Sequence, residues 1–311
     1  MAELKHTQSL APVALFVYNR PSHTRRVLES LQANALAEKT QLFVFADGPK
    51  EHATEEERKK IRQVREIVNE KKWCGKVSLI ISEKNKGLAA SVIDGVSEVT
   101  DAFGKIIVLE DDLVCSPHFL GFMNQSLDVY ENEDRVVCIS AYIYPVKERL
   151  PETFFLRGAD CWGWATWKRG WDMFDQDGKK LLNSIVQNRV EADFDFGNSY
   201  PYTQMLREQV EGKNNSWAIR WYASAFLENK LTLYPGRSLV QNTGVDGSGT
   251  HSGNSQKWNV QLAEEEIAVR PIDPVENAAA KGAVRSFFLD LRKQRFRDRL
   301  AARIRRFLGK K

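Results

Sequence analysis

Short apolar runs and amphipathic segments alternate over the first 140 residues of the chain. The apolar runs have the length of buried strands, and the segments between them carry the spacing of helices with one inward face. Strands that alternate with helices in this way predict an α/β fold with a mostly parallel central sheet and helices on both faces. The predicted strands are Val13–Tyr18, Leu42–Phe45, Val77–Ile81, Ile106–Leu109 and Val136–Ser140.

Several residues signal where the helices between these strands begin. Ser22 is a predicted N-cap, and Thr54 with Glu57 has the spacing of a capping box. Ser116 and Pro117 suit the N-cap and the first position of a further helix. The predicted helices are Ser22–Gln32, one from Thr54 to about Lys71, Leu88–Val99, and one from Ser116 to about Glu131.

Polar residues follow each of the first four strands. In parallel sheets ligands bind beyond the carboxyl ends of the strands, so these segments are expected to meet at one edge, called the rim below. Arg20 could bind a phosphate or a base edge, or be a surface arginine before a helix. Asp47 could bind a ligand, or it could be a turn residue in Asp-Gly-Pro. Lys86 precedes a helix N-terminus that could face the same pocket, or lies in a plain loop.

The fourth strand runs directly into the acidic triplet Glu110, Asp111 and Asp112. Three adjacent carboxylates repel one another unless a cation or hydrogen-bond donors offset their charge, and a hard divalent cation with oxygen ligands would do so. The alternative is a solvated acidic loop before the next helix. Such a metal most often bridges phosphates. No Gly-rich phosphate-binding loop follows any strand, so the metal would take the place of such a loop in stabilising the phosphates. The position of the triplet favours a metal-assisted site for a phosphate-bearing substrate.

The second half of the chain differs in composition. Residues 141–270 are rich in Trp, Gly and Tyr, and short strands with long loops are expected there. Without a linker between the halves, residues 1–270 are predicted to form one domain, with a first half at 11–140 and a second half at 141–270. Residues 271–282 are a predicted linker, and residues 283–311 form a basic tail.

Charge is distributed unevenly along the 311 residues, whose net charge is +4. The tail holds eight Arg, three Lys and two Asp, a net charge of +9 that leaves −5 for the rest. Apolar stripes at Val284–Leu291 and Phe296–Leu308 predict an amphipathic helix lying on an anionic membrane. The alternatives are a helix packed on the body and, more weakly, nucleic-acid binding, which we do not expect.

Other composition features exclude several classes of protein. The four Cys lack the CxxC spacing of zinc or redox sites, and they are too few for a disulfide scaffold. No apolar segment resembles a signal peptide or a membrane span. We therefore expect a cytoplasmic protein that is peripheral on the inner face of the cytoplasmic membrane.

The segments YNRP, ADGP, NKGLA and LEDDL resemble the donor half of nucleotide-sugar glycosyltransferases of the GT-A fold. The stretch VLEDDLVCSPHFL is similar to the N-acetylglucosaminyltransferase that initiates complex N-glycans, and RGADCWGWATW and SWAIRWYASAF resemble bacterial transferases of surface-polysaccharide clusters. The resemblance implies that Asp112 binds Mn²⁺ or Mg²⁺ and that Glu110 and Asp111 contact the ribose or the sugar. It also implies that Asp47 contacts the nucleotide base, expected to be uracil, and that Arg20 contacts the nucleotide or its phosphates.

Two later segments could complete such a site. Four Trp lie close together in DCWGWATWKRGW, where Trp162 and Trp164 could stack on a sugar ring or pack in a core. The segment GVDGSGTHSG, residues 244–253, could be a passive loop or a loop that closes over the donor diphosphate. The resemblance implies a role for His251 at the metal or the diphosphate.

The catalytic base is not given by the resemblance. An inverting transferase needs a carboxylate to deprotonate the acceptor hydroxyl. The N-glycan enzyme has it in a Trp-Asp-Asp-Trp stretch, whereas the corresponding Trp217–Trp221 contains no acid. Asp160 and Glu208 are the remaining candidates, with Asp160 preferred. Arg220 could instead bind an anionic acceptor or a donor phosphate.

The sequence therefore predicts a metal-dependent hexosyl- or N-acetylhexosaminyltransferase that moves a sugar from a nucleotide-diphosphate donor to a glycan or lipid-linked acceptor in surface polysaccharide synthesis. One alternative is a sugar-phosphate nucleotidyltransferase, for which no Gly-rich phosphate signature opens the chain. Another is a non-catalytic sugar-binding protein at the membrane, which the missing acid at 218–220 supports.

Overall fold

The computed structural model describes residues 9–244 and 256–308. Eight strands form one sheet in the order β3-β2-β1-β4-β8-β6-β9-β7. The first four neighbours run parallel, β6 and β9 are also parallel, and β8 and β7 run antiparallel to their neighbours. The strands of this sheet are β1 Val13–Val17, β2 Gln41–Ala46, β3 Lys76–Ile81, β4 Lys105–Glu110, β6 Val136–Ser140, β7 Thr153–Arg157, β8 Trp164–Trp167 and β9 Leu231–Pro235.

A second, two-stranded sheet was not predicted. β5 (Leu113–Cys115) follows the acidic triplet directly and pairs antiparallel with β10 (Val240–Asn242). We call this pair the β5–β10 ribbon. It brings a late segment of the chain back to the end of β4.

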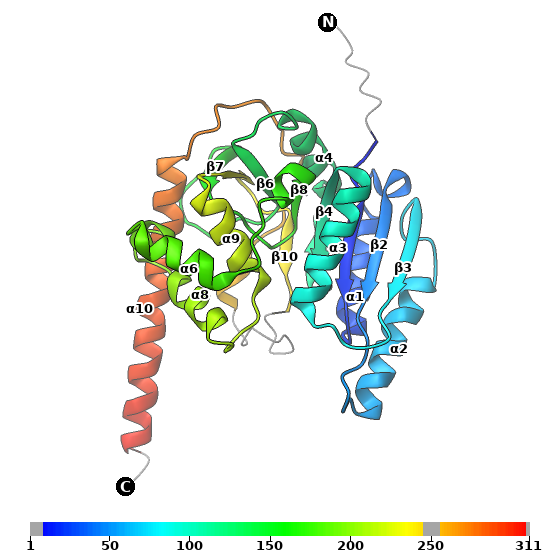
Figure 1. Ribbon diagram of the computed structural model, residues 1–311, viewed down its shortest axis with the longest axis horizontal. Helices are drawn as coiled ribbons and strands as arrows, with labels where there is room; N and C mark the ends of the chain where they lie inside the picture. The colour runs from blue at the N-terminus through cyan, green and yellow to red at the C-terminus, as the bar shows by residue number, and fades with distance from the viewer. Residues whose placement is uncertain (1–8, 245–255, 309–311) are drawn as a thin grey trace, which may run out of the picture.

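Helices cover both faces of the large sheet (Figure 1). Along β1, Val13 and Leu15 pack with helices α1, α2 and α4 on one face, while Ala14 and Phe16 pack with α3 and α9 on the other. A strand that is buried on both faces is the expected result of a parallel sheet between two helical layers. The helices of these layers are α1 Pro21–Gln32, α2 Glu55–Asn69, α3 Leu88–Phe103, α4 Phe119–Val129 and α9 Trp217–Leu227.

The helix starts were predicted with mixed success. Thr54 and Glu57 form the predicted capping box at the start of α2. α1 begins at Pro21, so Ser22 is not its N-cap. α4 begins at Phe119 rather than at Pro117, because the Ser116 hydroxyl bonds to the carbonyl of Ala263 and to the amide of His118.

The second half holds more helix than the expected short strands and long loops. Several helices form an outer layer around α9, where the core residues include Leu181, Phe194 and Leu206. Their apolar residues lie at helical spacing between the Trp-rich segments, a signal that the Gly and Trp content obscured. The remaining elements are η1 Ala37–Lys39, α5 Lys168–Trp171, α6 Gly178–Gln187, α7 Glu191–Phe194, α8 Tyr202–Val210, η2 Gln256–Trp258 and α10 Ala278–Leu308.

The basic tail belongs to one long helix, α10, that begins inside the predicted linker. The amide of Ala280 donates to the Asn277 side chain at its start. Val284, Phe288 and Leu291, from the first predicted membrane stripe, are buried against β7, β9 and Phe196. This stripe is therefore part of the protein core, and the prediction that it lies on a membrane is wrong. No helix in the described ranges is long and apolar enough to span a bilayer.

Candidate active site

The carboxyl ends of β1, β2, β3 and β4 lie next to one another, as the parallel register requires. The rim therefore gathers the segments that follow these strands, as predicted. It brings Arg20 to the acidic triplet and Asp47 to the turn at Asn85–Gly87. The first contact is an ion pair between a guanidinium and carboxylates, and the second is a carboxylate that accepts hydrogen bonds from a turn.

Arg20 forms ion pairs with two residues of the triplet. Its Nη2 lies 2.9 Å from Asp112 Oδ2 and also pairs with Asp111 Oδ1, and its Nε donates to Asp111 Oδ2 at 3.3 Å. Burial opposes the charged guanidinium, but the two carboxylates outweigh it, so the pKa of Arg20 is raised. Its buried Nη1 has no hydrogen-bond partner among the described residues. Arg20 thus holds the triplet together and keeps one donor for a ligand.

Arg20 compensates the triplet incompletely, because it pairs with Asp111 and Asp112 but not with Glu110. Asp111 is 4% exposed, and burial raises its pKa although Arg20 acts in the opposite direction. Burial, followed by the charges of Asp112 and Asp111, raises the pKa of Glu110 to about 8. No hydrogen bond from a described residue reaches the Glu110 carboxyl. The triplet therefore places three carboxyl groups beside a single guanidinium, which pairs with two of them.

The chain after β10 packs directly against Asp112. The amide and hydroxyl of Thr243 donate to the Asp112 carbonyl at 2.8 and 3.0 Å. A Cβ on Gly244 would lie 2.2 Å from Asp112 Oδ2 and 2.9 Å from Arg20 Nη1. Only glycine allows this close approach, so Thr243 and Gly244 belong to the site, although the sequence singled out only the loop that begins at Gly244.

The donor set suits a magnesium or manganese ion in kind, since Asp112 and Glu110 offer carboxylate oxygens and only Asp112 is paired with Arg20. Among the described residues, however, no group of three or more His, Cys, Asp or Glu side chains is arranged to hold a metal. Mg²⁺ commonly uses one or two carboxylates together with substrate phosphates and water, so two carboxylates are sufficient for such an ion. His251, the other predicted metal ligand, lies outside the described residues.

Asp47 has a fully bonded carboxylate. Its Oδ1 accepts from the amides of Gly48 and Lys86, both at 2.8 Å. Its Oδ2 accepts from Asn85 Nδ2 at 2.8 Å and from the amide of Gly87 at 2.9 Å. Four donors match the roughly four acceptor positions of a carboxylate. Asp47 therefore fixes the Asn85–Gly87 turn at the start of α3, and this geometry leaves it no vacant position for a nucleotide base.

Lys86 does not point to the triplet in this structure. Its Nζ pairs with Asp94 Oδ2 at 3.0 Å, on the exposed side of α3. Its contribution to the rim is its main-chain amide, which Asp47 binds. The predicted donor contact of the Lys86 side chain would need a different rotamer.

Asp160, the preferred base, lies half-buried between the Trp-rich segment and β9. Its Oδ1 accepts from the amides of Cys161 and Trp162, and its Oδ2 accepts from the Tyr234 hydroxyl at 3.0 Å. Burial raises the pKa of this carboxyl. The pKa of the neighbouring Cys161 thiol is raised by burial and then by the charges of Asp160 and Glu110. Asp160 and the triplet therefore lie on the same side of the molecule, around Cys161.

The four clustered Trp have separate roles. Trp164 is 0% exposed and packs against Trp171, Trp217 and Trp221, so it belongs to the core and not to a sugar-binding surface. Trp162 is half-buried and contacts the ring of Trp258 edge-on. Of the two predicted sugar platforms, only Trp162 has a partly exposed face.

Glu208 and Arg220 lie away from the triplet. Glu208 is on α8 in the outer layer, where it accepts from Gln204 of the same helix. Arg220 is buried on α9 and donates to the carbonyls of Ser216 and Gln176 and to Asn215. Burial lowers its pKa. The Arg220 guanidinium supports the turns before α6 and α9, and the structure gives no support to either residue as a contact of the donor.

A mostly parallel sheet whose strand ends collect an acidic triplet, an arginine and a backbone turn is the arrangement of the GT-A fold of nucleotide-diphospho-sugar transferases. Residues 13–190, more than half of the chain, match the family model of glycosyl transferase family 2. The chain belongs to glycosyl transferase family 2.

Solved structures to which the chain is similar have low sequence identity to it. UDP-glucose pyrophosphorylase complexed with UDP-glucose is 10% identical over 72% of this chain and 90% of that chain, with a TM-score of 0.34. An active-site mutant of LgtC is 9% identical over 58% and 65%, with a TM-score of 0.34. Mouse xyloside xylosyltransferase 1 is 11% identical over 70% and 82%, with a TM-score of 0.32. Among curated proteins, none matches this chain.

Proposed function

We propose that this glycosyltransferase moves a hexosyl or N-acetylhexosaminyl group from a UDP-sugar to a lipid-linked glycan during synthesis of a bacterial surface polysaccharide. The observation that carries the proposal is the acidic triplet with Arg20 at the end of β4. It combines three adjacent carboxyl groups, which suit a divalent cation, with a guanidinium nitrogen that has no partner among the described residues, which suits a phosphate oxygen.

We propose Mn²⁺ or Mg²⁺ as the cofactor, held by Asp112 with Glu110 beside it. When bound, such an ion supplies positive charge that stabilises a departing diphosphate. Arg20 Nη1 would bind an oxygen of the same diphosphate, and Asp111 keeps the guanidinium in place.

In the transfer, the bond between the anomeric carbon and the diphosphate oxygen breaks, and the acceptor hydroxyl oxygen forms the new bond. The hydroxyl proton passes to a carboxylate, for which Asp160 is the proposed base. Burial raises the pKa of Asp160, which makes its carboxylate a stronger base. The Tyr234 hydroxyl and the Cys161 amide orient the carboxylate for this step.

The test is Asp112→Asn, assayed with a panel of nucleotide sugars and Mn²⁺ for release of the nucleoside diphosphate. We expect turnover to fall by about 100-fold or more, the usual effect of removing a group that stabilises transition-state charge. Asp193→Asn, at an exposed position on α7, is the matched control. Full activity of Asp112→Asn would contradict the metal assignment.

Two other outcomes would identify the alternative functions. Release of pyrophosphate from a nucleoside triphosphate would identify a nucleotidyltransferase. Binding of nucleotide sugars without turnover would identify a non-catalytic protein.

We further propose that the distal part of α10 attaches the enzyme to an anionic membrane. Residues 293–308 continue past Leu291 for about 24 Å at about 1.5 Å per residue. In Figure 1 this part of α10 leaves the body on the side where β1–β4 end. Residues 295–311 hold six Arg and two Lys against one Asp, a net charge of +7. Attachment there would turn the rim toward a lipid-linked acceptor.

Truncation after Gln294 tests the attachment, because it keeps the buried Leu291. We expect the truncated protein to lose cosedimentation with phosphatidylglycerol-containing vesicles while donor hydrolysis continues. Vesicles of phosphatidylcholine alone are the control. Unchanged cosedimentation of the truncated protein would rule out this part of α10 as the anchor.

A further inference from the structure

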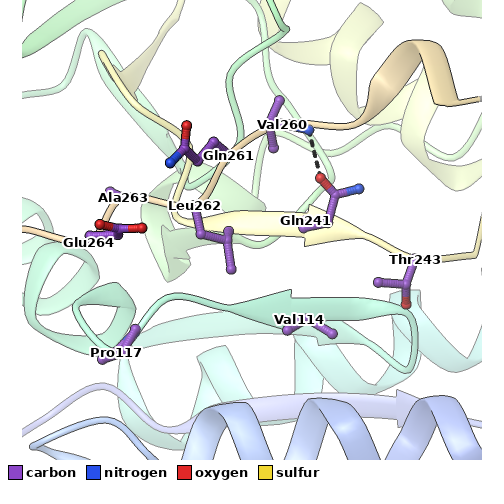
Figure 2. Close-up of a pocket in the computed structure, with 9 residues that line it drawn as sticks. All are labelled: Val114, Pro117, Gln241, Thr243, Val260, Gln261, Leu262, Ala263 and Glu264. Carbon is purple, nitrogen blue, oxygen red and sulfur yellow. Dashed lines mark hydrogen bonds between the residues drawn. The ribbon is translucent and has the colours of Figure 1, made fainter.

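A groove of about 540 Å³ lies beside the β5–β10 ribbon. Figure 2 shows its lining side chains, with Val114 on one wall, Val260 and Leu262 on the other, and Thr243 at one end. This volume falls within the range of about 300–1,000 Å³ that is usual for ligand pockets. The full lining is Val114, Pro117, Gln241, Thr243, Val260, Gln261, Leu262, Ala263 and Glu264.

One end of the groove, at Thr243, is hydrogen-bonded to Asp112 of the acidic triplet. Val114 pairs with Gln241 across the ribbon, and the ladder continues through the bond from the Thr243 amide to the Asp112 carbonyl. Asp112 and Thr243 each come one residue beyond a strand of the ribbon, and this bond joins them. A molecule that reacts beside Asp112 can therefore extend past Thr243 into the groove.

Hydrogen bonds fix both ends of the wall that faces the ribbon. The amide of Val260 donates to Gln241 Oε1 at 2.7 Å, as Figure 2 shows. The amide of Ala263 donates to the Ser238 carbonyl at 2.8 Å, and the Ala263 carbonyl accepts from the Ser116 hydroxyl at 2.7 Å. The groove is thus formed before any ligand binds, which reduces the entropy lost on binding.

The lining chemistry indicates what kind of molecule fits. The lining has no aromatic ring and no cation, and its only charged side chain is Glu264, at the end away from Thr243. A sugar ring would use aromatic faces and several hydrogen-bonding groups, and a phosphate would use cations. Branched aliphatic side chains instead favour a hydrocarbon chain through burial of apolar surface.

We propose that this groove binds the hydrocarbon chain of the acceptor lipid, with the reacting sugar held at Asp112. The inference rests on the proposed transfer to a lipid-linked acceptor. It gives the acceptor a site separate from Arg20 and the Asn85–Gly87 turn, which remain for the donor.

The test follows the methyl signals of Val and Leu by NMR in the full chain. The probes are n-octyl β-glucoside below its critical micelle concentration and glucose, which differ in the octyl chain. We expect octyl glucoside to shift the methyl signals of Val114, Val260 and Leu262, and glucose to leave them unchanged. Leu262→Trp, which fills the groove, should weaken octyl glucoside binding at least tenfold, whereas Val186→Trp, at an exposed position on α6, should not.

Equal shifts with glucose would show that the groove takes a sugar and would overturn the proposal. Unchanged binding in Leu262→Trp, or shifts confined to other apolar surfaces, would also overturn it. The experiment distinguishes failure of the groove proposal from failure of the proposed sugar transfer. Normal donor hydrolysis without chain binding rejects the groove alone, whereas chain binding without hydrolysis of any nucleotide sugar supports the groove and rejects the transferase proposal.

Discussion

The ends of β2 and β4 carry carboxylates in opposite states of hydrogen bonding. Asp47, at the end of β2, receives three hydrogen bonds from the Asn85–Gly87 turn and a fourth from the amide of Gly48. The triplet at the end of β4 shares one guanidinium, and Glu110 has no donor among the described residues. A saturated carboxylate stabilises the chain around it, whereas an under-compensated one has electrostatic energy to gain from a cationic ligand. Position on the rim alone does not separate these roles.

The largest effect is expected from Arg20→Met. The change leaves Asp111, 4% exposed, without its cationic partner. Removing one member of a buried ion pair costs about 3–5 kcal/mol, and the partly exposed rim places this site near 3 kcal/mol. Urea denaturation at pH 7 measures the loss.

The control for Arg20→Met is the double variant with Asp111→Asn, which removes the buried charge as well. It should recover most of the lost stability. An unchanged unfolding midpoint in Arg20→Met alone would mean that solvent already compensates the triplet, and the contrast with Asp47 would weaken.

Asp47→Asn is expected to have a smaller effect of about 2 kcal/mol. An amide nitrogen in place of Oδ2 cannot accept from Gly87 or from Asn85, so two donors lose their acceptor. Hydrogen exchange at the amides of Lys86 and Gly87 should become faster, and the midpoint of urea denaturation should fall.

These measurements distinguish support of the turn from direct contact with the base. If Asp47 binds the nucleotide itself, Asp47→Asn would raise the KM for the donor without changing stability or exchange. Asp193→Asn, an exposed change of the same kind, gives the baseline.

Local signals in the sequence predicted the first half of the fold well. The two-sided burial of β1 follows from its continuous apolar run, and the Thr54–Glu57 box requires only residues three apart. Ser116 had an equally good local signal at α4 but bonds to Ala263, 147 residues away. A distant partner of this kind cannot be read from the residues around the cap.

The same limit applies to the site. The order of the strands brought Arg20, Asp47 and the triplet to one rim, and this could be predicted. The hydrogen bonding of Asp47 depends on the directions of three backbone amides and one side chain around it. No spacing of residues in the sequence encodes these directions. The apolar stripe Val284–Leu291 was predicted to lie on a membrane but packs in the protein core, because its pattern does not tell a protein surface from a membrane.

Per pH unit, the smallest expected effect is a pH dependence of stability from Glu110, in protein kept free of divalent cations with EDTA. The folded-state pKa of about 8 lies above the unfolded value of about 4.3. The folded state therefore binds more protons between these values, and this contribution to stability is present below about pH 4.3 and is lost as the pH rises through about 8. The slope of stability against pH is at most about 1.4 kcal/mol per pH unit.

Glu110→Gln removes this titration. The unfolding free energies of wild type and variant are measured from pH 5 to 9, and their difference should shift in favour of the variant as the pH rises. A constant difference would show that the charge of Glu110 is already compensated in the folded protein. Asp47 and the acidic triplet would then differ less than their hydrogen bonds indicate.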